Sequence, residues 1–317
     1  MSVSVYVHPK TRHTIFQKDH TRAVLFQYGV RLVESPEEAT VLVGNRERFL
    51  HELIDAFGAS KRYLLWTHEP FYWTLTGKWA NIGGQRVRTI SLHSGEVFFN
   101  NYFYSSICSN PYSCTATPRR RLNRTAVIVS GAKSMGDPAV VARANKVDLL
   151  QIRYELAIAG HRAGLCDVYG KDWPPGVSRG ESRLGAWSLA KYEILEQYDF
   201  NICFENSLVP YYCSEKIWQA IHCGCLPIYY GQASIYQDFS EDSFLDYAHI
   251  GSPEALFDIV HRMTVSEFNE RYGRCLEIFE RAFPLGRPAQ EHAAHYAAMQ
   301  IVALNLAAPE RHASESV

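Results

Sequence analysis

Polar side chains with complementary chemistry gather at residues 214–216, where the pattern predicts the start of a helix. Ser214 is a favourable N-cap residue, and Glu215 and Lys216 follow it in the first helical turn. Backbone N–H groups of that turn have no partner within the helix, and with the helix dipole they attract anions. The Lys216 ammonium would add a full positive charge, and the Glu215 carboxylate could accept hydrogen bonds from the paired hydroxyls of a ribose. This chemistry suits a nucleoside diphosphate, whereas each residue taken singly is more typical of an ordinary surface.

The elements around this cluster form a strand, loop, helix and second strand. Phe200, Ile202 and Phe204 alternate with smaller or polar residues, as in a short buried strand. The helix that follows ends at Gly224, and residues 225–230 have the composition of another buried strand. A unit of this kind has parallel strands and a right-handed crossover, and it binds ligands beyond the strand ends.

This stretch resembles the signature of the α-1,3/4-fucosyltransferases, glycosyltransferase family 10. The resemblance is strong over Asp199 to Phe244 and weak elsewhere. The matching segments are Phe204-Glu205-Asn206-Ser207, Tyr212-Cys213-Ser214-Glu215-Lys216 and Pro227-Ile228-Tyr229-Tyr230-Gly231. The resemblance implies a site for the donor substrate GDP-fucose.

The resemblance also implies which residues contact that donor. The implied contacts are Asn206, Tyr212, Glu215 and Lys216. Arg153, in a helix predicted over residues 147–159, matches the family's arginine that supplies a second cation to the diphosphate. Two interpretations of Glu205 are open: it balances positive charge on the sugar ring in the transition state, or it is structural.

A carboxylate that could act as general base follows the strand predicted over residues 62–66. Glu69 lies beyond the C-terminal end of that strand, where ligands bind in a doubly wound sheet. An inverting transfer needs a base to take the proton of the acceptor hydroxyl, and such a base contributes about 10² to 10⁴ in rate. The family has a Glu-Ser-Pro segment here, whereas this chain has Glu69-Pro70, which is one residue shorter. Glu69 is the predicted base, and an ordinary loop carboxylate before a turn proline is the alternative.

Residues that could contact the acceptor sugar lie near Glu69 and after a strand predicted over residues 87–92. Aromatic faces stack on sugars, although aromatic clusters more often belong to a core. The candidates are His68, Trp73, His93 and Glu96. His68 is the weaker alternative base, because strand alternation turns its side chain away from that of Glu69. The family resemblance implies α-1,3 transfer to GlcNAc or Glc of a lactosamine-type glycan.

Strands and helices alternate along the chain, which predicts an α/β fold with parallel, doubly wound sheets. The resemblance implies the GT-B architecture, two Rossmann-like domains facing across a cleft. A linker is predicted over residues 110–124, which are rich in Pro, Ser, Thr and Arg. The predicted domains are 1–120 for the acceptor and 121–308 for GDP-fucose, followed by a disordered tail at 309–317.

Composition restricts the classes of partner. Lys and Arg total 32 against 33 Asp and Glu, so no surplus charge favours nucleic acid. The eight cysteines are scattered and fit reduced core thiols better than disulfides or a zinc site. No Asp-x-Asp pair occurs, and no metal is expected to be obligatory, because the helix dipole, Lys216 and Arg153 would stabilise the diphosphate instead.

The expected compartment is the cytoplasm, and a location at the inner face of a membrane is the alternative. No run approaches the roughly 18 apolar residues of a spanning helix. A predicted strand begins within a few residues of Met1, which favours a bacterial cytosolic enzyme over a trimmed Golgi enzyme. Two other functions stay open: a GT-B transferase for another nucleotide sugar, as in exostosin-like enzymes, and a noncatalytic glycan-binding protein.

Overall fold

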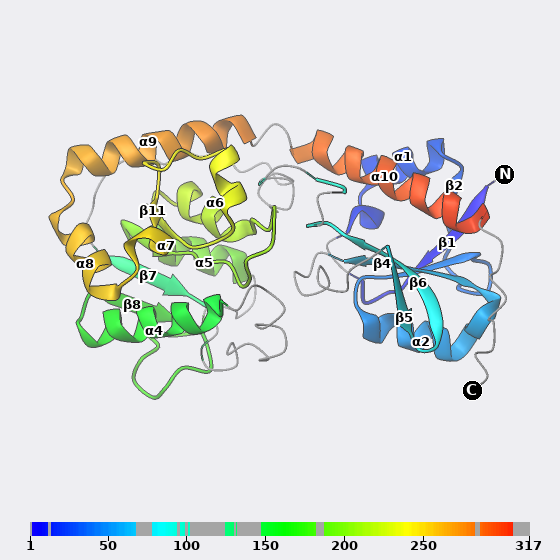
Figure 1. The fold of residues 1–317 in the computed structure, drawn as a ribbon, viewed down its shortest axis with the longest axis horizontal. Coiled ribbons are helices and arrows are strands. Elements are labelled where there is room, and N and C mark those ends of the chain that lie inside the picture. Colours follow the sequence, from blue (N-terminus) through cyan, green and yellow to red (C-terminus); the bar gives the residue numbers. More distant parts are fainter. Residues whose placement is uncertain are drawn as a thin grey trace. The chain divides into compact units, whose positions relative to one another are not determined.

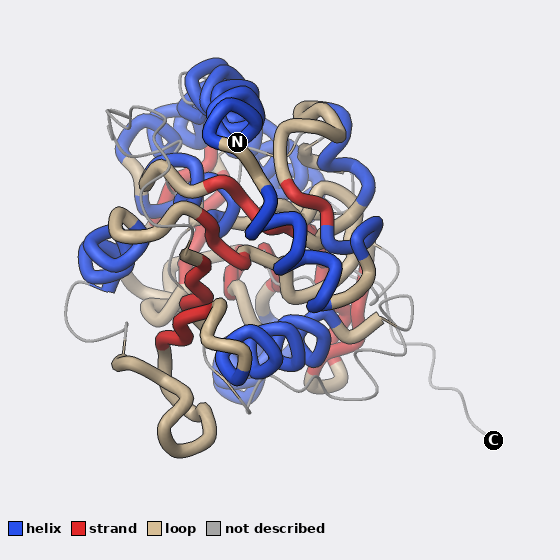
Figure 2. The backbone as a smooth tube through the Cα atoms, turned by 90° about the vertical axis from the view of Figure 1, so that its left-hand side faces the viewer, coloured by secondary structure: helices blue, strands red, loops and turns tan. Residues whose placement is uncertain are grey.

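The computed structural model describes residues 2–11, 14–67, 78–93, 96–98, 101, 124–129, 131, 147–181, 187–282 and 286–306. The chain divides into two compact units, Met1–Val97 with Pro288–Val317, and Phe98–Arg287 (Figure 1). Each unit is an α/β structure, and Figure 2 shows how helices and strands alternate along the backbone.

The first unit is built on a six-stranded sheet with the order β2-β1-β3-β4-β6-β5. Its strands are β1 (Val3–Val7), β2 (Val30–Leu32), β3 (Val41–Gly44), β4 (Arg62–Thr67), β5 (Trp79–Ile82) and β6 (Gln85–Ser91). Its helices are η1 (Ile15–Gln17), α1 (Asp19–Gln27), α2 (Glu47–Phe57), η2 (Gly58–Ser60) and α10 (Gly286–Leu306). All neighbouring strands are parallel except β5 and β6, which confirms the predicted doubly wound fold for this unit.

The antiparallel pair β5–β6 is a hairpin that the sequence analysis does not predict. Gly83 and Gly84 form its turn with φ angles of 55° and 73°. Glycine adopts this left-handed region without steric cost, and two-residue turns of this kind match the twist of the flanking strands. Trp79 begins β5, and the guanidinium of Arg86 lies over its ring at 4.2 Å.

The terminal helix α10 packs on the first unit from Pro288 onward. Arg88 of β6 donates to the Gln300 side chain at 2.9 and 3.1 Å, and His295 contacts the Tyr28 hydroxyl at 3.0 Å. Figure 1 shows α10 beside α1. The predicted second domain, 121–308, included this helix. Sequence pattern does not specify where a helix packs, because its packing depends on contacts between residues far apart in the chain.

The second unit contains a five-stranded, fully parallel sheet with the order β11-β10-β9-β7-β8. Its strands are β7 (Thr125–Ile128), β8 (Cys166–Tyr169), β9 (Phe200–Ile202), β10 (Leu226–Tyr229) and β11 (Leu245–Asp246). Its helices are α4 (Leu149–Arg162), α5 (Trp187–Leu195), α6 (Glu215–His222), η6 (Ala233–Gln237), α7 (Tyr247–Ile250), α8 (Pro253–Arg262) and α9 (Val265–Ala282). The predicted unit β9–α6–β10 is confirmed, since β9 and β10 are parallel neighbours. The strand order reverses between β7 and β9, and ligands of such sheets bind beyond the C-terminal ends of the strands at that point.

Helix α6 is fixed against the core of this unit along its apolar face. Trp218 is buried, with ring centroids 5.5 Å from Phe239 and 6.2 Å from Phe279 of α9. The Tyr272 hydroxyl of α9 donates to the Ile221 carbonyl of α6 at 2.5 Å. These contacts hold the first turn of α6 in a fixed position at the sheet edge.

The described cysteines are buried free thiols. They are Cys166, Cys203, Cys213, Cys223, Cys225 and Cys275. Burial raises the pKa of the Cys203 thiol, so this group stays protonated near neutral pH. Their burial agrees with the predicted location of the cysteines in the core.

Some predictions concern residues that the structure does not describe. These include the tail from residue 309, most of the linker at 110–124 and the domain boundary near residue 120. Within the described ranges, no helix is both long enough and apolar enough to cross a bilayer.

Candidate functional site

The candidate site lies where β9 ends and α6 begins. Glu205 and Asn206 follow β9, and Ser214 to Lys216 begin α6. Arg153 comes from α4, the helix that follows β7 on the other side of the point where the strand order reverses. These elements bring together residues that are more than 60 positions apart in the sequence at the sheet edge where ligands bind.

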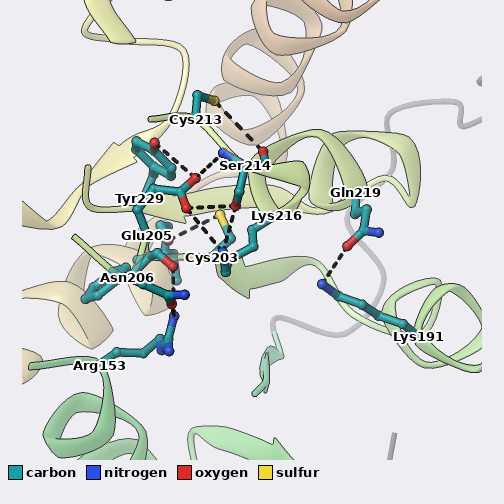
Figure 3. A network of polar contacts seen from close by, with 12 residues as sticks. Arg153, Lys191, Cys203, Glu205, Asn206, Cys213, Ser214, Lys216, Gln219 and Tyr229 are labelled. Carbon is teal, nitrogen blue, oxygen red and sulfur yellow. Dashed lines mark hydrogen bonds and ion pairs between the residues drawn. The ribbon is translucent and has the colours of Figure 1, made fainter. Parts of the chain in front are cut away.

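Glu205 is the centre of this site, and its side chain is 0% exposed. Its Oε1 accepts from the Ser214 backbone N–H at 2.7 Å and from the Tyr229 hydroxyl at 3.4 Å. Its Oε2 accepts from the Ser214 hydroxyl at 2.7 Å and from the Lys216 ammonium at 3.2 Å (Figure 3). Both oxygens of the carboxylate are therefore engaged by protein donors.

Ser214 occupies the predicted N-cap position of α6, but its hydroxyl does not cap the helix. The residue is extended, and no hydrogen bond joins its side chain to the first-turn N–H groups. The hydroxyl instead donates to Glu205 and accepts from Lys216 Nζ at 2.7 Å. The first-turn N–H groups are thus not taken up by their own cap, which is the condition for an anion to be bound there.

Lys216 is held as a cation next to this turn. Its side chain is 13% exposed, and it pairs with Glu205. Burial lowers the pKa of Lys216, but the charges of Glu205 and Glu215 outweigh burial and the pKa is raised overall. The ammonium group is therefore fixed in direction by two partners and stays charged over the physiological range.

Arg153 is a second buried cation at the same edge. Its Nη1 donates to the Phe204 carbonyl at 2.8 Å and to Asn206 Oδ1 at 3.3 Å. Burial lowers the pKa of Arg153 to about 10, against the opposing charge of Glu205, so the group remains protonated at neutral pH. Arg153 thereby orients Asn206, whose side chain is exposed at the rim of the site.

The remaining predicted donor residues lie at the same helix start. Glu215 is the first residue of α6 and is half-buried, and Tyr212 is buried just before it. The preceding residue, Tyr211, has a φ of 59°, and its N–H donates to the Ser234 hydroxyl at 3.0 Å. A non-glycine residue in this region is uncommon and often marks a functional loop.

Packing explains why a glycine stands at position 231, the last residue of the third motif. A Cβ atom there would meet the Tyr229 hydroxyl at 2.4 Å. Tyr229 is buried and donates to Glu205, so the glycine leaves room for the ring that completes the Glu205 network. Sequence reasoning gave Tyr229 no role of its own, although its place in the motif was the available signal.

The predicted acceptor residues are only partly described. Glu69, His68 and Trp73 lie outside the described residues. His93 is fully buried, and its backbone N–H lies 3.4 Å from the Ser91 hydroxyl. Glu96 is half-buried near Tyr296 of α10, and the pKa of that tyrosine is raised by burial and by Glu96. Their role toward an acceptor stays a prediction.

The part of the chain that the structure describes contains no cluster of three or more His, Cys, Asp or Glu side chains suited to a metal ion. The positive charge around the start of α6 comes from Lys216 and Arg153. Their arrangement suits an anionic ligand such as a diphosphate.

Comparison with known proteins gives matches in this region. Residues 167–277 match the model of glycosyltransferase family 10 (fucosyltransferase), C-terminal part. An alpha-(1,3)-fucosyltransferase FucT of Helicobacter pylori is 45% identical over 56 residues, which are 18% of this chain and 12% of that protein. A GDP-fucose protein O-fucosyltransferase 3 of Danio rerio is 36% identical over 73 residues, 23% of this chain and 15% of that protein. The aligned stretches thus cover a small part of these relatives.

A crystal structure of an alpha1,3-fucosyltransferase with GDP-fucose aligns over 89% of this chain and 90% of that chain, with a TM-score of 0.47 and 14% identity. Each of the two units is an α/β structure built on a largely parallel sheet, and in the second unit Lys216 lies at a helix start beyond the strand ends. All three motifs lie within residues 167–277, the segment that matches the family-10 model, as the resemblance predicted.

Proposed function

We propose that this protein is an inverting fucosyltransferase that moves L-fucose from GDP-β-L-fucose to a hydroxyl of a glycan acceptor. The observation that carries the proposal is the first turn of α6, where Glu205 holds Lys216 in place inside the family-10 segment. Arg153 adds a second cation at the same sheet edge.

The donor diphosphate binds at the start of α6 in this proposal. The backbone N–H groups of the first turn, the Lys216 ammonium and Arg153 with Asn206 bind its oxygens, and Glu215 accepts from the ribose hydroxyls. Tyr212 lines the wall. As the bond to fucose lengthens, negative charge grows on the diphosphate, and fixed cations stabilise that charge more than they stabilise the ground state. These cations supply the electrostatics that a metal ion supplies elsewhere, so the reaction is proposed not to require a metal.

Glu205 has a supporting role in this proposal and does not face the sugar. Its two oxygens receive four donors from Ser214, Lys216 and Tyr229. A carboxylate used in this way orients the cation and the helix start. The four donors to Glu205 therefore favour a structural role for this residue over a direct contact with the fucosyl ring.

Glu69 is the proposed general base. It would take the proton from the acceptor hydroxyl as that oxygen attacks the fucose carbon opposite to the leaving GDP, which converts the β-linked donor to an α-fucoside. The proposed linkage is α-1,3 to GlcNAc or Glc of a lactosamine-type glycan, a specificity that rests on the family resemblance.

Two measurements test the proposal. Thermal unfolding with GDP, GDP-fucose and UDP compares ligands, because a ligand that binds the native state raises the unfolding temperature by mass action. A larger shift with UDP than with GDP would refute the choice of donor. Mass spectrometry of N-acetyllactosamine incubated with GDP-fucose then detects transfer as the mass of one added fucose. Binding of GDP without transfer to any glycan in an acceptor panel would indicate a noncatalytic glycan-binding protein.

A further inference from the structure

A second lysine near the start of α6 has no role in the site described so far. Lys191 of α5 is 7% exposed, and its Nζ donates to Gln219 Oε1 of α6 at 2.6 Å (Figure 3). Within the described residues, one hydrogen bond is seen for this ammonium group, which has three N–H donors. A neutral amide does not offset the cost of burying a charge. Burial accordingly lowers the pKa of Lys191, and the charge of Glu215 acts in the opposite direction.

The geometry of α6 places this lysine on the face that carries Glu215. Glu215 and Gln219 are four residues apart in the helix, so their side chains are neighbours on one face. The charge of Glu215 acts to raise the pKa of both lysines, but Lys191 is hydrogen-bonded to Gln219, whereas Lys216 is paired with Glu205. The start of α6 is therefore flanked by two lysines with different bonded partners, Glu205 for Lys216 and Gln219 for Lys191.

We propose that Lys191 is a positioning residue for the nucleotide site. Its ammonium, anchored by Gln219 on the same helix face, holds the Glu215 carboxylate in the orientation that accepts hydrogen bonds from the vicinal hydroxyl pair of a ribose. This inference rests on the proposed function and deepens it by separating two tasks at one helix start. Lys216 acts on the diphosphate, and Lys191 acts through Glu215 on the sugar of the nucleotide.

The variant Lys191→Met tests this role with two probes, GDP and 2′,3′-dideoxy-GDP, by calorimetric titration. Methionine fills a similar volume without charge. We expect GDP affinity to fall about tenfold, within the range for a residue coupled to the ligand through one contact. Affinity for the dideoxy probe, which lacks the hydroxyl pair, should not change. Lys10→Met is the matched control, because it removes an ammonium that is 66% exposed in the first unit.

Two further variants separate positioning from simple structural support. Gln219→Glu keeps the contact to Lys191 but neutralises its field, so GDP affinity should again fall while the protein stays folded. Lys191→Met with Gln219→Met replaces the buried polar pair by apolar side chains, which is often neutral or stabilising. We expect this double variant to unfold at a urea concentration no lower than the wild type and still to bind GDP more weakly.

The outcomes are distinguishable from a failure of the proposed function. Wild-type protein that does not bind GDP would refute the proposed function itself. Wild-type binding of GDP with an unchanged affinity in Lys191→Met would refute only the role of Lys191. An equal loss for GDP and the dideoxy probe would also refute it, since that result indicates general loosening of the helix start.

Discussion

Replacing Glu205 by glutamine is the sharpest test of how the site is held together. The substitution keeps size and shape but removes the negative charge and turns one oxygen into an NH₂ group. Four donors from three residues meet the two oxygens of Glu205, so the new amide must point hydrogens at at least one of those donors. Lys216, 13% exposed, loses its counter-charge at the same time.

The expected loss is large because a partly buried charge is left without its partner. Removing one member of a buried ion pair costs about 3–5 kcal/mol of unfolding free energy. For a protein of this size each kcal/mol lowers the unfolding temperature by about 2–4 °C, so a decrease on the order of 6–20 °C is expected. Urea denaturation followed by circular dichroism gives the free energy, and differential scanning fluorimetry gives the temperature.

A matched control and a double variant complete the Glu205 test. Glu193→Gln makes the same chemical change at an exposed site on α5 and should alter stability by less than about 0.5 kcal/mol. Combining Glu205→Gln with Lys216→Met removes both charges, so the double variant should lose less than the sum of the two single variants. A Glu205→Gln protein as stable as the Glu193→Gln control would refute the view that this carboxylate organises the helix start.

Three other outcomes follow from the same contacts. Folding raises the pKa of Lys216, so its stabilising contribution should be complete below the unfolded pKa near 10.4 and should disappear as pH rises through the folded pKa. Urea denaturation from pH 8 to 11 gives the difference in unfolding free energy between wild type and Lys216→Met. This difference should shrink only at the alkaline end. Gly231→Ala places a Cβ 2.4 Å from the buried Tyr229 hydroxyl and should cost about 1–3 kcal/mol in urea denaturation, whereas Gly180→Ala, with nothing within 4 Å, should be neutral. Glu69→Gln should lower the rate of fucose transfer by about 10² to 10⁴ in a mass-spectrometric assay and leave the GDP-induced thermal shift unchanged, and full turnover by this variant would exclude Glu69 as the base.

The sequence alone determined the elements that position the site. Alternation of Phe200 and Ile202 specifies a buried strand, and the apolar face after Ser214 specifies a helix, because both patterns depend only on which side chains share a face. The strand at 200–202 pairs in parallel with the strand at 226–229, as expected for two strands joined by a helical crossover. The hairpin turn at Gly83 and Gly84 was not predicted, although the local sequence carries a signal for it, since paired glycines between short strands favour such turns.

Only the tertiary structure decided what the polar side chains do. Glu205 follows a strand at a ligand-binding edge, yet it turns inward to four donors, and Ser214 gives its hydroxyl to Glu205 instead of capping its own helix. The bond between Lys191 and Gln219 joins two helices across 28 positions of the sequence. Local pattern determines which face of an element is buried, but a buried polar group takes whichever partner the packed fold brings within reach, because leaving it without one costs more than any local preference supplies.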